Sequence, residues 1–279
     1  VKEVLEEHGC RRVGFESDIV TYDQYTKWKE KLKEIEWVPA AGLVEELRMV
    51  KSDEEIACIE KAAAIADEAW AELLPRMRPG ATEKELALEL EFLMRKKGAE
   101  GLAFNVILAS GPNGALPHAV PSDRPLQEGD LVVMDFGARV NGYCSDMTRT
   151  VVIGKACQRS RTLYNIVLDA QQAAVAAVKA GRTGKEIDAV ARGLIADAGY
   201  GDHFGHGLGH SVGLAIHEDP RLAPKAETVL QPGMVVTVEP GIYIPGFGGV
   251  RIEDLVVVTE TGCRILTQST KDLVELGSE

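Results

Sequence analysis

The feature of the sequence that most constrains its fold is an internal repeat. RPGATEKEL at residues 78–86 resembles KAGRTGKEI at 179–187, and LQEGDLVVMDFG at 126–137 resembles LQPGMVVTVEPG at 230–241. The two pairs are separated by similar distances, 101 and 104 residues, although helix-start and turn signals can also coincide by chance. Self-similarity at a fixed spacing indicates copies of one structural unit. We therefore expect a single domain with pseudo-two-fold symmetry, not two independent domains.

Each half predicts helices followed by strands. A glutamate three residues after a serine or threonine marks helix starts at Ser52, Thr82 and Thr183, and a further helix is expected over about 160–180. Segments rich in β-branched residues are typical of strands, namely FNVILAS, LVVMDFGARV, CSDMTRTVVIG, MVVTVEPG, VRIEDLVVV and CRIL. The chain of 279 residues thus predicts one large domain that contains both helices and strands.

Residues 1–40 predict a separate small unit. A short helix, the strand RRVGFES, an amphipathic helix over about 21–35 and the segment WVPA form one crossover. Such a unit is too small to bury a core of its own. The chain starts with Val1 instead of methionine, so we expect its natural N-terminus to lie further upstream.

Charge and cysteine usage limit the classes of partner and compartment. The net charge of −12 disfavours phosphate backbones and anionic membranes, so we expect neither nucleic acid nor a membrane as partner. The sequence contains no run of eighteen apolar residues, so no transmembrane helix is predicted. The five cysteines are scattered and odd in number, and no signal peptide is recognised. These features predict a cytoplasmic protein.

The repeat aligns acidic residues of the two halves. Asp135 falls opposite Glu239, and Asp146 falls opposite Glu253 after a slip of three residues. The hairpin signal Asn141-Gly142, read as a two-residue turn, pairs Asp135 with the position two residues from Asp146. These two carboxylates then share one face of the hairpin, with Cα atoms roughly 7–8 Å apart. Acids from both halves are therefore expected to form one cluster.

Four carboxylates in an apolar site need compensating positive charge. Arg149 and Arg251 could supply it in a structural network of salt bridges. Two divalent cations would also balance four negative charges, and such ions lie about 3.5–4 Å apart when bridged. The spacing of the acids alone leaves both alternatives open.

Histidines follow the same symmetry. His206, His210 and His217 are four and seven residues apart among glycines, which allow the backbone to approach a ligand closely. His118 precedes the first acidic strand and corresponds to His217 with an offset of 99. Imidazoles are thus expected beside the carboxylate cluster.

The motifs MDFG, SDMTRT, HGLGH, HEDP, VEPG and RIED, in this order, resemble the metallopeptidases of the pita-bread fold. That family includes methionine aminopeptidase, aminopeptidase P and prolidase, and the resemblance covers about residues 45–279. It implies an α+β pita-bread fold, in which a pseudo-two-fold repeat of helices packs on a curved, mainly antiparallel β-sheet. It also implies that the metal ligands are Asp135, Asp146, His210, Glu239 and Glu253. In such a site Asp135 and Glu253 bridge two ions, Asp146 chelates one ion, and His210 completes the shell of the other.

Further features are similar to the prolidase and aminopeptidase P branch. His206 in HGLGH resembles that branch, whereas methionine aminopeptidases resemble HGxG. LRMVKSDEEIACIEKA at 47–62 is similar to the branch's linker. Residues 1–44 resemble the remnant of a creatinase/prolidase-type N-terminal domain, followed by a catalytic domain at 45–279. Most of the N-terminal domain is absent, which puts the dimer and the limit on substrate length in doubt and leaves a homodimer open.

The resemblance implies a metallo-exopeptidase that hydrolyses the Xaa-Pro bond of dipeptides or peptide N-termini through a metal-bridging hydroxide. Glu239 would act as general base and later as proton donor. His118 and His217 would hydrogen-bond the scissile carbonyl or leaving nitrogen and stabilise the oxyanion. His206 would contact the proline side of the peptide substrate.

The ligand set also bears on the metal and on its support. Four carboxylates and one imidazole favour Mn²⁺, with Co²⁺ and Zn²⁺ as alternatives. Arg251 is expected to orient the metal carboxylates together with Thr148, unless it is a plain surface arginine. Cys144 is interpreted as a packed neighbour of Asp146 and not as a ligand.

Other functions on this fold remain as alternatives. They are a methionine aminopeptidase-like activity, a non-catalytic binding module that has lost its metal ligands, and a creatinase-like amidinohydrolase that works without metal. The intact ligand set disfavours the last two.

Overall fold

The computed structural model describes residues 1–277 and contains two compact units, Val1–Arg48 and the chain from Met49 onward. In the first unit, strands β1 (Arg12–Phe15) and β2 (Glu36–Pro39) pair in parallel and are connected through helix α2 (Tyr22–Lys31). The predicted crossover is therefore confirmed, although its helix is shorter than expected. Helix α1 (Lys2–Glu7) precedes it and helix α3 (Leu43–Met49) follows it. No residue of the first unit is buried.

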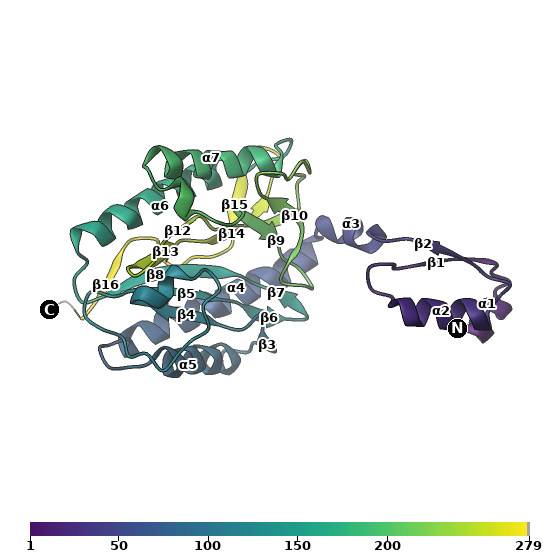
Figure 1. The fold of residues 1–279 in the computed structure, drawn as a ribbon, viewed down its shortest axis with the longest axis horizontal. Helices are drawn as coiled ribbons and strands as arrows, with labels where there is room; N and C mark the ends of the chain where they lie inside the picture. The colour runs from purple at the N-terminus through teal and green to yellow at the C-terminus, as the bar shows by residue number, and fades with distance from the viewer. Residues whose placement is uncertain (278–279) are drawn as a thin grey trace. The chain divides into compact units, whose positions relative to one another are not determined.

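Two pairs of long helices enclose the larger unit. Helices α4 (Asp53–Leu73) and α5 (Glu83–Lys96) cover one side of its sheets, and α6 (Gln158–Ala177) and α7 (Gly184–Asp197) cover the other (Figure 1). The predicted capping boxes at the starts of α4, α5 and α7 are all formed. Short 3-10 turns are η1 (Leu74–Arg76), η2 (Gly111–Ala115) and η3 (Gly201–His203).

The strands between these helices form two principal sheets with the orders β16-β8-β5-β4 and β10-β9-β11-β14-β15. The smaller sheets are β12-β13 and β3-β6-β7. Pairing in the larger unit is antiparallel except between β8 and β16. The bounds are β3 (Gly101–Leu102), β4 (Ile107–Ser110), β5 (Leu131–Phe136), β6 (Ala138–Val140), β7 (Tyr143–Cys144), β8 (Met147–Ile153), β9 (Gly209–Ser211), β10 (Glu218–Leu222), β11 (Val235–Val238), β12 (Gly241–Ile244), β13 (Gly248–Arg251), β14 (Asp254–Val258), β15 (Cys263–Ile265) and β16 (Val274–Leu276).

The repeat inferred from the sequence has a direct counterpart in the sheets. The antiparallel series β4-β5-β8 of the first half corresponds to β9-β11-β14 of the second. The start of α5 forms a β-bridge between Thr82 and Pro125, and the start of α7 forms the equivalent bridge between Thr183 and Val229. Equivalent elements therefore place equivalent residues around one pseudo-two-fold axis.

The hairpin register predicted from Asn141-Gly142 is confirmed. Asn141 and Gly142 both adopt positive φ, at 49° and 82°, as the two-residue turn requires. Val140 pairs with Tyr143, and further along the hairpin Asp135 pairs with Thr148.

Several expectations about strands need correction. The segment 144–154 is divided between β7 and β8, and the segment 250–258 is divided between β13 and β14, which belong to different sheets. The segment 131–140 is not one strand, because β5 and β6 are separated at Gly137. A Cβ atom at Gly137 would lie 1.9 Å from the carbonyl oxygen of Ser145, so the close backbone approach requires glycine. The glycine- and histidine-rich region 201–217 contains β9, which lacks the β-branched composition that identifies strands.

The helices bury their apolar faces on the sheets, and α4 also packs against the sheet of the other half, because Ile59 lies in one core with Val235 and Leu255. Leu90 and Leu93 of α5 lie in one core with Phe136 of β5, while Ile187 of α7 lies in another with Val236 of β11. Because helices cover the sheets, the acidic residues of the central strands, such as Asp135 in β5 and Glu253 directly before β14, are largely shielded from solvent. No helix among residues 1–277 is long and apolar enough to span a membrane.

The covered face of α5 provides a test of this packing. Leu90→Ala should lower the free energy of unfolding by about 2–5 kcal/mol, because it leaves a cavity at a fully buried position. Leu88→Ala on the same helix should change it by no more than about 0.5 kcal/mol, since Leu88 is 68% exposed. Urea unfolding followed by circular dichroism measures both. Equal effects of the two substitutions would contradict the orientation of α5.

Candidate metal centre

Three carboxylates from both halves meet at the centre of the larger unit. Asp135 lies in β5, Asp146 directly before β8 and Glu253 directly before β14. One carboxylate oxygen from each lies within 4.8 Å of the others. Asp146 and Glu253 are only 4% and 1% exposed. The expected convergence of acids across the repeat is therefore present in the structure.

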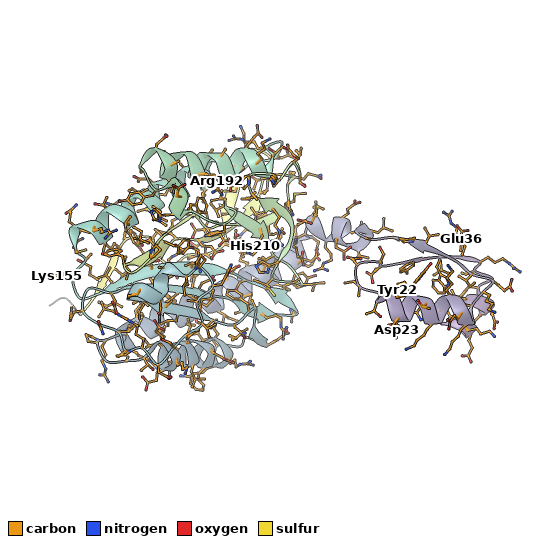
Figure 2. The ribbon with its side chains drawn as sticks, in the orientation of Figure 1. Tyr22, Asp23, Glu36, Lys155, Arg192 and His210 are labelled. Atoms are coloured by element: carbon orange, nitrogen blue, oxygen red, sulfur yellow. The ribbon has the colours of Figure 1, made fainter. Side chains whose placement is uncertain are left out.

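Glu239 and His210 adjoin this cluster. Nε2 of His210, on β9, lies 3.5 Å from Oδ2 of Asp146 and 3.4 Å from Oε1 of Glu239. Figure 2 shows His210 in this unit, with Arg192 of α7 above it in the view. Thr237 on β11 fixes both groups, because its hydroxyl accepts from the His210 backbone N–H at 3.0 Å and donates to Glu239 at 3.1 Å. The structure thus brings together all the residues predicted as ligands.

Burial determines the protonation of this group. It raises the pKa of Asp146 and Glu253 well above the usual range, and the neighbouring acids raise it further. Burial also raises the pKa of Glu239 to about 8. It lowers the pKa of His210 to about 3, so this imidazole is neutral near pH 7. An imidazolium therefore does not compensate the acids.

The salt-bridge alternative is met only in part. Arg251 contacts Asp135, with Nη2 and Oδ2 2.6 Å apart, whereas Arg149 pairs with Asp254, which lies outside the group of predicted ligands. Among the described residues, three buried carboxylate oxygens have no hydrogen-bond partner: Asp135 Oδ1, Asp146 Oδ1 and Glu253 Oε1. Buried acceptors without partners are costly.

The donor set fits divalent cations. Nδ1 of His210 lies 3.1 Å from the Ser211 carbonyl oxygen, which can only accept, so the neutral ring carries its proton there. The lone pair of Nε2 then faces Asp146 and Glu239. An imidazole lone pair among carboxylate oxygens is a site for a hard or borderline metal ion. The partnerless oxygens of Asp135, Asp146 and Glu253 and the free lone pair of His210 are therefore the atoms that could hold a metal.

Arg251 and Thr148 both form hydrogen bonds within the cluster. Arg251 is 2% exposed, so the alternative of a surface arginine is wrong. Its Nε donates to the Thr148 hydroxyl at 3.0 Å, and this hydroxyl donates to Oε2 of Glu253 at 2.7 Å. Together with the contact to Asp135, these bonds orient acids from both halves. Cys144 is buried, and burial raises the pKa of its thiol to about 11.

The cluster borders a cavity of about 390 Å³. The predicted imidazoles His118, His206 and His217 all line it. Apolar side chains also contribute, namely Phe104, Ile107, Pro117 and Ile216. The rings of His217 and His210 lie 4.4 Å apart between centroids. The cavity therefore combines acids, imidazoles and an apolar wall.

Tyr243 on β12 was not recognised in the sequence. Its hydroxyl accepts from Nη1 of Arg251 at 2.8 Å and lies 2.9 Å from Nε2 of His206. Nδ1 of His206 donates to the Gly207 carbonyl oxygen at 2.8 Å, so the ring proton lies on Nδ1 and Nε2 accepts from the tyrosine hydroxyl. Tyr243 thus links the acid cluster to the histidines of the cavity. Its segment, GIYI, contains no titratable pattern that would have identified it.

Other residues of the site lay outside the predicted set. Arg221 lines the cavity with its side chain 47% exposed. Lys51, from the segment interpreted as a linker, forms a buried ion pair with Glu218 at 3.1 Å and donates to the Ser211 hydroxyl at 2.9 Å. These contacts fix the loop between His210 and His217. The sequence contains no local signal for contacts that span about 160 residues.

The fold and these residues define a class of protein. Residues 57–260 match metallopeptidase family M24, and residues 1–50 match the creatinase/prolidase N-terminal domain. The chain belongs to metallopeptidase family M24. This confirms the predicted pita-bread fold and a metallo-exopeptidase, together with the similarity to the prolidase and aminopeptidase P branch.

Several relatives are similar to this chain over nearly its whole length. An Xaa-Pro dipeptidase of Pyrococcus furiosus is 48% identical over 98% of this chain and 78% of its own. The structure of an Xaa-Pro dipeptidase from Bacillus anthracis superimposes with a TM-score of 0.96 at 50% identity, covering 98% of this chain and 77% of that one. An X-Pro aminopeptidase from Thermotoga maritima gives 0.94 at 40% identity, covering 99% and 78%.

Proposed function

We propose that this chain is a dinuclear metal-dependent exopeptidase that hydrolyses the Xaa-Pro bond of dipeptides or peptide N-termini. The observation that supports this most is the set of three buried, partnerless carboxylate oxygens beside a cavity lined by three histidines. The similarity to Xaa-Pro dipeptidases and an X-Pro aminopeptidase supports the substrate class. Residues 45–279 would form the catalytic domain and 1–44 the remnant of an N-terminal domain.

Asp135, Asp146, His210, Glu239 and Glu253 would hold two divalent ions, for which Mn²⁺ suits the oxygen-rich donor set. When bound, such ions supply Lewis acidity, which acidifies water and polarises a carbonyl group. Arg251 and Thr148 keep the carboxylates in place through the bonds described above. The protein thus fixes the positions of its ligands before the substrate arrives.

The remaining steps belong to side chains of the cavity. Glu239 would take a proton from the attacking water and deliver it to the prolyl nitrogen as that nitrogen leaves. His118 and His217 would hydrogen-bond the scissile carbonyl oxygen or the leaving nitrogen and stabilise the developing negative charge. His206, held by Tyr243, would contact the proline side of the substrate.

The cavity suits a tertiary amide. An Xaa-Pro bond has no N–H, so recognition must act on its carbonyl oxygen and on the flanking groups. Imidazoles can address the carbonyl, and the apolar wall that includes Phe104 and Ile216 can pack against aliphatic groups. Arg221 adds a cation that can pair with the free carboxylate of a dipeptide.

The proposal is tested by incubating metal-free protein with Mn²⁺, Co²⁺ or Zn²⁺ and an Xaa-Pro dipeptide. Proline release should depend on the metal and should be strongest with Mn²⁺. Parallel reactions with Xaa-Pro-Yaa, Xaa-Ala and Met-Ala peptides separate dipeptidase, aminopeptidase and methionine aminopeptidase activities. Absence of release of the Xaa residue with every metal and from both proline peptides would contradict the proposal.

Arg221 provides a prediction about substrate length. Arg221→Ala should raise KM for an Xaa-Pro dipeptide by about 10–100-fold, the effect of losing a charge-assisted hydrogen bond of about 1.5–3 kcal/mol. The KM for Xaa-Pro-Yaa should change less, because the carboxylate of a longer peptide lies elsewhere. Arg78→Ala, at an exposed position, is the control. Equal changes for both substrates would exclude this role of Arg221.

A further inference from the structure

We infer that Arg149 is a positioning residue that fastens β8 to β14 and thereby fixes the separation between metal-binding carboxylates of the two halves. The inference rests on the proposed metal site. Asp146 directly precedes β8, and Glu253 directly precedes β14. These strands belong to different sheets, so a continuous ladder of backbone hydrogen bonds does not set their separation.

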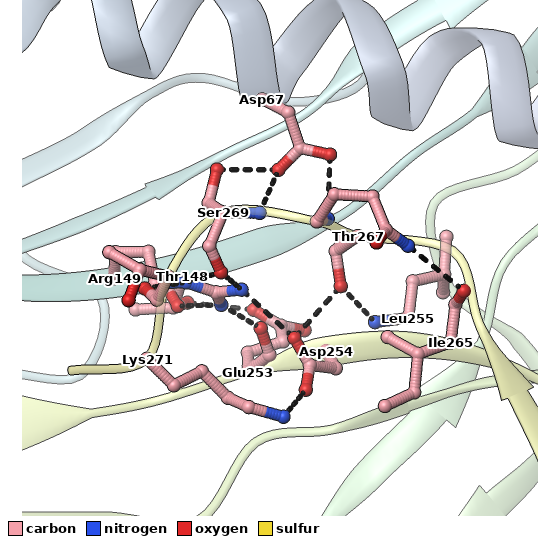
Figure 3. Close-up of polar contacts among 12 residues, drawn as sticks. Asp67, Thr148, Arg149, Glu253, Asp254, Leu255, Ile265, Thr267, Ser269 and Lys271 are labelled. Atoms are coloured by element: carbon pink, nitrogen blue, oxygen red, sulfur yellow. Dashed lines mark hydrogen bonds and ion pairs between the residues drawn. The ribbon is translucent and has the colours of Figure 1, made fainter.

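The guanidinium of Arg149 contacts the backbone of both strands at the acids. Its Nη1 donates to the carbonyl oxygen of Thr148 at 2.9 Å and also to the carbonyl oxygen of Glu253 (Figure 3). The backbone N–H of Glu253 donates to the same Thr148 carbonyl at 3.1 Å. Since Thr148 also donates its hydroxyl to the Glu253 carboxylate, a shift of either strand would move this ligand.

The charge of Arg149 is fully compensated away from the metal cluster. Arg149 and Asp254 are each 1% exposed, and Nη2 donates to Oδ1 of Asp254 at 2.9 Å. Asp254 also accepts from Gln171 at 2.9 Å, from Thr267 at 2.9 Å and from Lys271. A buried ion pair with all its hydrogen bonds satisfied tolerates only a narrow range of geometries.

Residues 267–271, the strap, complete the hydrogen bonds of Arg149 and Asp254. The carbonyl oxygens of Ser269 and Thr270 accept from Nε of Arg149 at 3.2 and 3.0 Å. Asp67 of α4 holds the strap, because its carboxylate accepts from the backbone N–H groups of Gln268 and Ser269, each at 2.8 Å. Figure 3 shows Asp67 on one side of the strap and Arg149 on the other.

This arrangement explains why an ion pair occupies a position where apolar side chains could pack. Replacing a buried ion pair by apolar residues is often neutral or stabilising, so stability alone does not account for the pair. The carboxylates of the metal cluster repel one another, and loosened strands would allow them to separate. Groups that orient metal ligands typically affect metal affinity by about 10–100-fold.

The test separates positioning from stability with Arg149→Met, the double variant Arg149→Met/Asp254→Leu, and Asp67→Ala. Mn²⁺ affinity is measured by isothermal titration calorimetry, and stability by urea unfolding of the metal-free proteins. Arg149→Met should raise the Kd for Mn²⁺ by about 10–100-fold and shift the urea midpoint downward. The double variant should keep the weakened Mn²⁺ affinity, and its midpoint should stay below the wild-type value because Gln171, Thr267 and Lys271 lose their bonds to Asp254. Arg264→Met, which removes an exposed pair with Glu60, is the matched control and should change neither quantity.

Wild-type Mn²⁺ affinity in the double variant would overturn the inference and leave Arg149 a purely structural role. If Arg149→Met does not fold, Asp67→Ala decides, because it releases the strap and leaves the ion pair in place. Its Kd for Mn²⁺ should rise several-fold, and an unchanged Kd would again overturn the inference. A wild-type protein that binds no divalent metal would instead contradict the proposed function.

Discussion

Glu239→Gln should lower kcat by about 10²–10⁴-fold, the range expected for loss of a general base. Glutamine has nearly the same shape and can still accept the hydrogen bond from Thr237. It cannot take a proton from water or pass one to the leaving nitrogen. Hydrolysis of an Xaa-Pro dipeptide, followed by proline release at saturating Mn²⁺, measures the effect.

Metal saturation matters in this experiment because Glu239 is also a proposed ligand. A loss of affinity alone would disappear at high Mn²⁺, whereas a loss of proton transfer would persist. Glu260→Gln, at an exposed position after β14, is the matched control and should retain wild-type kcat. A near-normal kcat for Glu239→Gln at saturating metal would assign the proton transfers to another group.

Asp146→Asn should change activity and metal-free stability in opposite directions. The substitution removes a proposed ligand, so activity should fall by more than about 100-fold, beyond the effect of losing an outer supporting group. It also removes a buried carboxylate that lies near Asp135 and Glu253 and has one partnerless oxygen. The free energy of unfolding of the metal-free protein should therefore rise, by about 1–4 kcal/mol.

Asp188→Asn supplies the contrast for this prediction. Asp188 is as buried as Asp146, but it forms a two-pronged ion pair with Arg192, at 2.7 and 2.8 Å. Removing its charge should lower the free energy of unfolding by about 1.5–3 kcal/mol, because the charge-assisted hydrogen bonds from Arg192 are lost or weakened. Urea unfolding in the presence of a chelator compares the two variants. If Asp146→Asn were destabilised like Asp188→Asn, the cluster would be a structural network and not a set of metal-binding acids.

Local signals in the sequence were sufficient for much of the scaffold. The capping boxes at Ser52, Thr82 and Thr183 lie within four residues each, and all three are formed. The turn at Asn141-Gly142 needs positive φ at both positions, and its length of two residues predicted the register in which β5 pairs with β8. The convergence of acids followed from applying the same strand arrangement to both copies of the repeat.

The pairing of buried charges was decided only by tertiary structure. The sequence offered Arg149 and Arg251 as equivalent candidates to neutralise the acids, yet of these two only Arg251 forms an ion pair with one of their carboxylates. Tyr243 and Lys51 likewise acquire their roles through partners brought close by folding.

The division has a physical reason. Helix starts, turns and strand register depend on hydrogen bonds between residues close in the chain, and the repeat transfers that information from one half to the other. The partner of a buried guanidinium depends on how sheets, helices and the C-terminal strap pack together, over separations of more than 100 residues. The sequence by itself determined the halves and their acids, whereas packing between the halves determined which charges remain for a metal.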